Sequence, residues 1–71
     1  MVYTLWDTAT ANMIDAFTSE EAALEEVRLT VEESGRPAAV TWALGYKDAA
    51  GRLHSIASGD ALIDRAFAVP A

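Results

Sequence analysis

Alternating hydrophobic and polar positions predict that the chain opens with a β-hairpin. Residues 2–6 (Val-Tyr-Thr-Leu-Trp) are rich in β-branched and aromatic side chains, and residues 13–17 (Met-Ile-Asp-Ala-Phe) alternate again. Between them, residues 7–12 (Asp-Thr-Ala-Thr-Ala-Asn) favour a turn without supplying a glycine. One turn residue must therefore take a positive φ. Of the two candidates, Ala11 and Asn12, the asparagine tolerates it better.

A helix is predicted between Thr18 and Gly35. Thr18-Ser19-Glu20-Glu21 fits a capping box, in which the Thr18 hydroxyl accepts from the Glu21 amide and the Glu21 carboxylate accepts from the Thr18 amide. Gly35 suits a left-handed cap, and Pro37 prevents the helix from continuing. The apolar side chains form one stripe, which predicts the side that faces the core: Ala23, Leu24, Val27 and Val31.

Residues 39–57 predict a second hairpin whose first strand has a face of large side chains and a face of small ones. The large face holds Val40, Trp42, Leu44 and Tyr46, and the small face, predicted to meet solvent, holds Thr41, Ala43 and Gly45. Residues 48–51 (Asp-Ala-Ala-Gly) fit a type I turn that pairs Lys47 with Arg52 and Tyr46 with Leu53. In this register the large face continues with Leu53, Ser55 and Ala57, and the small face with His54 and Ile56.

Residues 58–60 (Ser-Gly-Asp) are suited to cap a short final helix, in which Leu62, Ile63, Ala66 and Phe67 recur on one side. The order of elements is then ββαββα. We expect one α+β domain over residues 1–71, with a four-stranded, mainly antiparallel sheet and its helices on one face.

Length and composition predict a thin core. The chain has 71 residues, of which 52% are hydrophobic, but 15 residues are alanine. A domain of this size gains roughly 3 to 5 kcal/mol from its core, so small domains often rely on disulfides, metals or a second subunit. Cysteine is absent, which removes disulfides, thiolate metal ligands and cysteine nucleophiles. Oligomerisation is the stabilising device that remains, and we expect a homodimer.

The charge balance excludes several classes of partner. Lys and Arg number 5 against 11 Asp and Glu, which gives a formal net charge of −6. Nucleic acids are bound through cations that neutralise phosphates, so the chain is not expected to bind DNA or RNA. Residues 1–7 lack the basic and apolar regions of a secretory signal, and no apolar run approaches the roughly 18 residues of a membrane span. We therefore expect a cytoplasmic protein without membrane contact.

The opening of the predicted helix resembles known proteins. Residues 18–28 (Thr-Ser-Glu-Glu-Ala-Ala-Leu-Glu-Glu-Val-Arg) lie between two predicted hairpins. This arrangement resembles small uncharacterised bacterial proteins in which a T-x-E-E-A helix lies between strand pairs, and which have no assigned activity. The same opening resembles, more weakly, HicB-type antitoxins, whose small domain pairs with a toxin. This chain differs from them in having only two predicted strands before the helix.

His54 is the chain's single histidine, the residue type used most often as a general acid or base near neutral pH. On the predicted hairpin, Asp48 lies too far along its arm to contact His54, and Ser55 points to the other face. A catalytic base needs an orienting group and a pocket. His54 is therefore predicted to be an exposed strand residue, and no catalytic residue is expected.

Two carboxylate pairs, Asp7 with Asp15 and Asp60 with Asp64, are the candidates for a metal site. Neither pair supplies the six or so oxygens that a hard cation such as calcium requires. We interpret Asp7 as a turn residue that bonds to its own backbone and Asp60 as a helix cap. No metal or cofactor site is predicted.

The acidic charge is concentrated on the first predicted helix. Its Glu residues outnumber Arg28 by five, which is most of the net charge of the chain. This helix is either a solvated face that keeps the protein soluble or a docking surface for a basic protein partner. Leu29 and Ala22 lie away from the core stripe, so they are either isolated exposed residues or partner contacts.

An exposed sheet edge is a second candidate for a contact. Residues 2–6 carry no charge and no proline, so we expect this strand to be an unguarded edge that a second copy covers, with Thr4 at the contact. The leading hypothesis is a small, non-enzymatic protein-interaction module that self-associates. The alternative is a small-molecule-binding or enzymatic subunit whose pocket forms between chains, lined by His54, Trp6 or Trp42.

Overall fold

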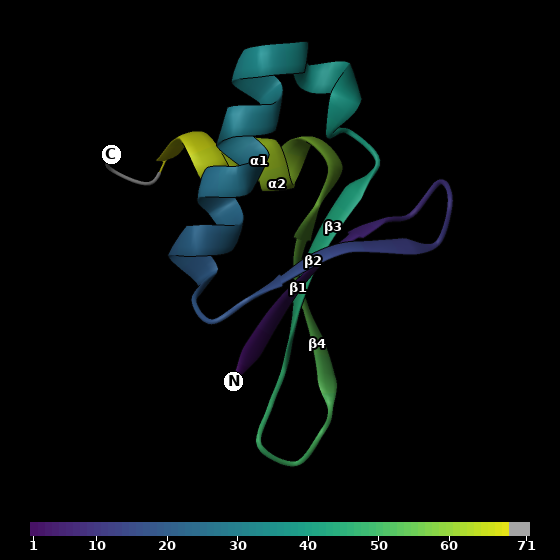
Figure 1. The fold of residues 1–71 in the computed structure, drawn as a ribbon, viewed down its shortest axis with the longest axis vertical. Helices are drawn as coiled ribbons and strands as arrows, with labels where there is room; N and C mark the ends of the chain where they lie inside the picture. The colour runs from purple at the N-terminus through teal and green to yellow at the C-terminus, as the bar shows by residue number, and fades with distance from the viewer. Residues whose placement is uncertain (69–71) are drawn as a thin grey trace.

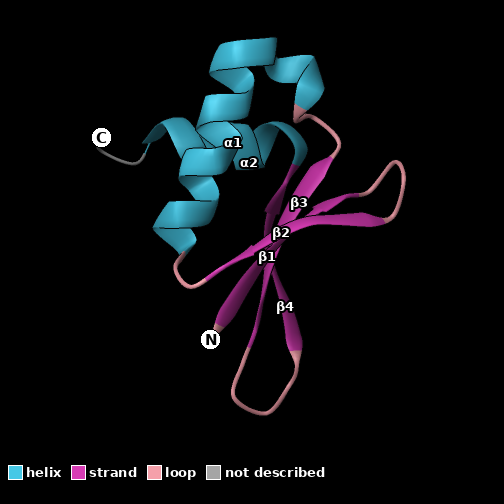
Figure 2. Ribbon diagram, in the orientation of Figure 1, coloured by secondary structure: helices cyan, strands magenta, loops and turns pink. Residues whose placement is uncertain are grey.

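The computed structural model describes residues 1–68, which follow the order ββαββα. The elements are β1 (Val2–Asp7), β2 (Asn12–Phe17), α1 (Glu20–Ser34), β3 (Trp42–Lys47), β4 (Leu53–Ser58) and α2 (Gly59–Ala68), with a 3-10 turn η1 (Arg36–Ala38) after α1. The strands form one antiparallel sheet in the order β2-β1-β3-β4. Both helices lie on one side of it, and two hairpin turns project away from them (Figure 1, Figure 2). The α+β prediction is confirmed.

The strand order places β1 in the middle of the sheet. β1 pairs with β2 on one side and with β3 on the other, so the prediction that residues 2–6 form an exposed edge is wrong. The first hairpin leaves one side of β1 unpaired, and the second hairpin fills that side with its own first strand. The edges are β2 and β4. Each has a register shift in its pairing, an irregularity that discourages the addition of another strand.

The turn between β1 and β2 contains the expected residue with positive φ. It is Ala11, with φ 58°, because Asn12 belongs to β2 and pairs with Asp7. The asparagine alternative is therefore wrong. Asp7 is a turn residue as predicted, since its Oδ1 accepts from the Ala9 amide at 3.0 Å and also from the Thr41 hydroxyl at 3.0 Å.

The cap of α1 lies one residue later than predicted. Ser19 is the N-cap, with an extended backbone and a hydroxyl that accepts from the Ala22 amide at 3.2 Å. The capping box centred on Thr18 is wrong, because Glu21 is then at the second helical position, too early to reach back to the cap. The helix ends at Gly35 as predicted, with a positive φ of 85° and an amide that donates back into the last turn at 2.7 Å, but its ψ of 167° is extended instead of left-handed helical.

The segment between α1 and β3 is not a strand. η1 turns the chain directly after Gly35, and Pro37 suits this turn because its ring fixes φ and it has no amide hydrogen for a strand ladder. Ala39 is fully buried below the turn, and β3 begins only at Trp42. Val40 precedes the strand and is exposed, so its predicted place on the core-facing side is wrong.

The β3–β4 turn is shorter than predicted. The Asp48 amide donates to the Arg52 carbonyl at 2.9 Å, which leaves a loop of residues 49–51 whose glycine has φ 82°. Tyr46 therefore pairs with His54. A change of register by one residue moves every side chain of a strand to its other face.

Several predictions for β4 are wrong for this reason. Leu53 and Ser55 lie on the side away from the helices, and His54 lies on the helix side. A register shift further along β4 skips Ile56, which packs against the core, whereas it was expected on the small face. The same shift returns Ala57 to the predicted side, opposite Leu44.

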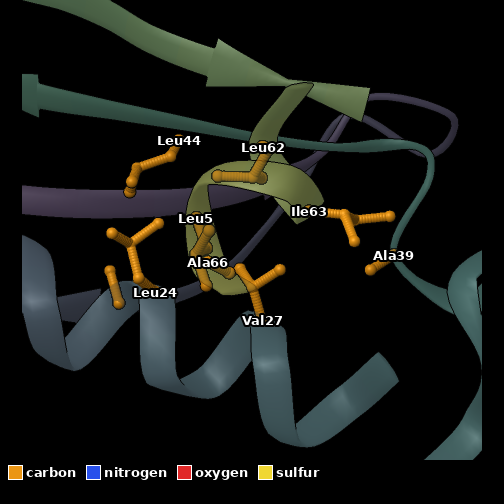
Figure 3. Packing of buried hydrophobic residues seen from close by; sticks show 9 residues of the cluster. Leu5, Leu24, Val27, Ala39, Leu44, Leu62, Ile63 and Ala66 are labelled. Carbon is orange, nitrogen blue, oxygen red and sulfur yellow. The ribbon is translucent and has the colours of Figure 1, made fainter. Parts of the chain in front are cut away.

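The core lies between the sheet and the two helices. In Figure 3, Leu5 of β1, Leu24 and Val27 of α1, and Ala66 of α2 point toward one another. The fully buried side chains are Leu5, Ala23, Leu24, Val27, Ala39, Leu44, Leu62, Ile63 and Ala66. The predicted core stripe of α1 is therefore confirmed, with Val31 packed at its margin.

Two aromatic side chains lie outside this centre. Trp42 is partly buried and packs against the edge of the core, on the predicted side of β3. Phe67 recurs with Leu62, Ile63 and Ala66 along α2, but unlike them it is exposed. The core is thus built from aliphatic residues and alanine.

β4 passes into α2 without a loop. Ser58 ends the strand, and Gly59 begins the helix with φ 60°. The positive φ favours glycine at this position, whereas a Cβ there would make only an ordinary contact with the Val40 carbonyl oxygen at 3.4 Å. α2 is also tied to the first turn of α1, because Arg65 Nη2 lies 2.7 Å from Glu20 Oε2.

Candidate interaction surface

The side of the sheet opposite the helices carries no other element in the part of the chain that the structure describes (Figure 2). We call its central residues the open face: Thr4, Trp6, Met13, Ala43, Gly45, Leu53 and Ser55. Cross-strand pairs share a side of a sheet, and strand residues alternate between sides. The pairs Trp6–Ala43, Thr4–Gly45 and Gly45–Ser55 therefore join β1, β3 and β4 on this side, and Met13 extends it by pairing with Trp6.

The open face is hollowed above its small residues. The hollow has a volume of about 600 Å³, and its lining includes Trp6 and Leu53 together with the smaller Ala43 and Gly45. It exists because small side chains lie between large ones on a pleated surface. Gly45 is required there, since a Cβ would lie 2.8 Å from the His54 carbonyl oxygen of the neighbouring strand.

Trp6 is held in place beside the hollow. Its indole Nε1 donates to Thr4 Oγ1 at 3.0 Å, so the ring leans along β1 toward Thr4. The side chain is nevertheless 37% exposed, and Met13 and Leu53 are 52% and 68% exposed. Large apolar side chains gathered and exposed on one face are typical of a surface that another molecule covers.

The structure separates the three predicted contact residues. Thr4 lies on the open face, in an inner strand instead of at an edge. Leu29 is 43% exposed on α1, and the half-buried Ala22 lies about two turns earlier on the same helix. Because α1 covers the opposite side of the sheet, Thr4 does not share a surface with the other two.

Charge is distributed unevenly between the two sides of the molecule. The Glu residues of α1 lie on the helix side, where Glu20 is paired with Arg65 and Glu32 lies 3.6 Å from the Nε of Arg28. None of the seven residues of the open face is charged, but Lys47, which pairs with Leu53, lies exposed on the same side of the sheet. The acidic helix and the open face are therefore two distinct surfaces, on opposite layers.

His54 has a carboxylate partner, contrary to the prediction. Its Nε2 lies 2.8 Å from Asp48 Oδ2, and its ring stacks on Tyr46 with the centroids 4.7 Å apart. The short turn brings Asp48 opposite Arg52 and hence close to the start of β4. Asp48 Oδ1 also accepts from the amides of Ala50 and Arg52, each at 2.9 Å.

The Asp48 carboxylate organises the turn. The hydrogen bond with His54, followed by the one from the Arg52 amide, holds the pKa of Asp48 below its ordinary value. Ser55 lies on the other face of the strand from His54, as predicted. These bonds fix the end of the hairpin, and they thereby set the position of Leu53 on the open face.

Arg36 forms ion pairs with both Asp60 and Asp64. Arg36 Nη2 lies 3.0 Å from Asp60 Oδ1 and 3.1 Å from Asp64 Oδ1, and the two carboxylates raise the pKa of the guanidinium. These ion pairs join η1 to α2, and Asp60 lies within the helix instead of at its cap. Within residues 1–68, no three His, Asp or Glu side chains gather as a group that could hold a metal ion.

Comparison with known proteins identifies no relative. No protein-family model, no curated protein and no solved structure matches the chain. The two resemblances of the helix opening therefore stay predictions. Neither α1 nor α2 combines the length and the apolar composition that crossing a membrane demands.

Sequence reasoning finds part of the open face and misses the rest. The alternation along β3 predicts the solvent-facing side correctly for Ala43 and Gly45. The alternation does not predict that Trp6 and Leu53 lie on the same side as Ala43 and Gly45. Their position depends on the pairing of β1 with β3 and on the length of the β3–β4 turn. One local signal was available: a type I turn followed by glycine often closes a three-residue loop, and this loop turns Leu53 to the open face.

Proposed function

We propose that this protein is a non-enzymatic protein-interaction module that forms a homodimer through its open face. The observation that supports the proposal is the gathering of exposed Trp6, Met13 and Leu53 on the side of the sheet that α1 and α2 leave uncovered. A two-layer domain of 71 residues has a thin core. Covering the open face with a second copy adds an apolar layer without any additional sequence.

The distribution of charge permits a second copy as the partner. Two chains with a net charge of −6 repel each other, but most of that charge lies on α1. When two open faces meet, two sheets separate the acidic helices. With layers about 10 Å apart, the two α1 helices are roughly 30 Å apart. This distance is several times the Debye length of about 8 Å at physiological ionic strength, so the repulsion is screened.

The area of the whole sheet sets an upper limit on the surface that a dimer formed through this side can bury. Four strands about 4.8 Å apart, each six residues long at about 3.3 Å per residue, cover roughly 400 Å². Two such faces bury about 800 Å² when the sheet is treated as flat, and projecting side chains increase this area. The total approaches the lower end of specific interfaces, near 1,000 to 1,200 Å². A homodimer with a Kd in the micromolar range is expected.

Paired substitutions test which surface associates. At about 100 μM, well above a micromolar Kd, sedimentation equilibrium should show a dimer for the wild type and for Leu29→Lys on α1. Thr4→Lys adds the same charge to the open face and should give a monomer with an unchanged circular dichroism spectrum. Because Thr4→Lys also removes the bond to Trp6, Met13→Lys is the second open-face variant, and it should weaken the dimer as well.

Three results would contradict the homodimer through the open face. A monomeric wild type at this concentration would contradict self-association. A dimer lost in Leu29→Lys but kept in both open-face variants would move the contact to the acidic helix. A monomer whose Trp6 fluorescence responds to a small aromatic probe would favour the small-molecule-binding alternative, since a hollow of about 600 Å³ lies within the size range of ligand pockets.

A further inference from the structure

We infer that the open face is self-complementary, so that in the homodimer Trp6 of each copy occupies the hollow of the other copy, above Ala43 and Gly45. This rests on the proposed homodimer and adds the register in which the two faces meet. The occupant of the hollow is therefore the indole of a second copy of this chain.

Apart from Leu53 at the start of β4 and Thr4 on β1, the residues of the open face divide into a half with large side chains and a half with small ones. Trp6 of β1 and Met13 of β2 form a pair of large side chains at one end. Ala43 and Gly45 of β3 lie beside β1 and are small, and Ser55 of β4 continues this half. The boundary runs between the inner strands β1 and β3, in the middle of the sheet. A face divided in this way fits a copy of itself when the two halves are exchanged.

A two-fold axis between β1 and β3, parallel to both strands, makes that exchange. It lays β1 of one copy over β3 of the other, so each residue faces the copy of its own cross-strand partner. Because Trp6 pairs with Ala43 and Thr4 with Gly45 within one chain, Trp6 faces Ala43 and Thr4 faces Gly45 between copies. These positions lie next to the axis. They are therefore little affected by the twist of the outer strands or by the angle of about 30° between packed sheets.

The orientation of the indole agrees with this register. The bond from Trp6 Nε1 to Thr4 Oγ1 inclines the ring from Trp6 toward Thr4. Projected onto the facing copy, that direction runs from Ala43 toward Gly45, along the lining of the hollow. Gly45 has no Cβ, so the ring can approach the backbone closely there. The hydrogen bond thus holds the indole in the pose that the hollow of a second copy accepts.

An exchange of side-chain size tests this register. Trp6→Ala removes the large group and Ala43→Trp fills the hollow, so each single variant should raise the Kd of the dimer at least about tenfold. The double variant Trp6→Ala/Ala43→Trp again sets a tryptophan opposite an alanine, because the two-fold axis exchanges these positions. Its Kd should return to within about threefold of the wild type. Leu29→Ala on α1 is the control and should leave the Kd unchanged.

Sedimentation of these proteins separates failure of the register from failure of the homodimer. A double variant as weak as the single variants, or single variants as tight as the wild type, would overturn the register while the homodimer stands. A monomeric wild type would overturn both. If the double variant does not fold, Trp6 fluorescence decides in a Trp42→Phe background, where Trp6 is the remaining tryptophan. Its emission should shift to shorter wavelength as the dimer forms, and a dimer without that shift would overturn the inference.

Discussion

The two sides of the sheet are made by the same strands but differ in what their side chains contact. Leu5 and Leu44 pair across β1 and β3 and are fully buried beneath the helices. One residue along each strand, Trp6 and Ala43 pair on the other side, where Trp6 remains 37% exposed. Apolar character therefore does not decide burial in this molecule. Two helices cover one side of a four-stranded sheet, and the apolar residues of the other side become a surface.

Replacing one buried side chain should strongly destabilise the core on the side of the sheet that the helices cover. Leu5→Ala is expected to lower the free energy of unfolding by about 3 to 5 kcal/mol, because a cavity adds to the lost burial. That loss approaches the whole stability of a domain of this size. Met13→Ala removes a side chain of similar size from the open face and should cost the monomer about 0.5 kcal/mol or less. Urea unfolding at about 1 μM, near or below the expected Kd, measures both; equal losses would show that the two sides are wrongly assigned.

The helix α1, which covers one side of the sheet, can be weakened at its N-cap. Ser19→Ala should destabilise the protein by about 1 kcal/mol, because the Ala22 amide loses its acceptor. Thr18→Ala is the matched control, and as Thr18 is not the cap, its effect should be within about 0.5 kcal/mol of zero. Thermal or urea unfolding distinguishes them. A larger loss in Thr18→Ala than in Ser19→Ala would restore the capping box that the sequence alone favours.

The smallest effect is expected at the turn that positions Leu53. The pKa of Asp48 is lowered in the folded protein, chiefly by His54, so its carboxylate stabilises the fold above the ordinary Asp pKa of about 3.9. This stabilisation is lost as the pH falls through the lower, folded pKa. The wild type should therefore be more stable than Asp48→Asn at about pH 5, and the difference should shrink below about pH 4. Thermal melting at both pH values measures it, and a difference of the same size at both would exclude the carboxylate as its source.

The sequence predicts those parts of the fold that depend on local periodicity. The stripe of Ala23, Leu24 and Val27 emerges from helical spacing, and the large and small faces of β3 from strand spacing. Both are confirmed because each depends on the geometry of a single element. The order of elements follows for the same reason, since turn residues and caps separate them clearly.

The strand order and the register of β4 depend on contacts between elements, which the local sequence pattern does not determine. Residues 2–6 form a plausible edge until the second hairpin pairs with them. The segment from Asp48 to Arg52 is compatible with a four-residue turn and with the three-residue loop that forms. In the loop that forms, Asp48 bonds to His54, a contact that appears only once the register is set. Local sequence patterns do not predict the open face, because this surface forms only when β3 pairs with β1 and when Leu53 points away from the helices.

The direct joint between β4 and α2 has a consequence for how the length of this chain can change. Each residue of a helix advances the chain by about 100°, so one residue inserted between Ser58 and Gly59 would swing Leu62 and Ile63 out of the core. No loop is available at this joint to absorb the change. The turn at residues 49–51 projects into solvent, but its three-residue length sets the register of β4 and turns Leu53 to the open face. A change of length is therefore expected to be costly at both ends of β4, through the core contacts of α2 at one end and through the strand register at the other.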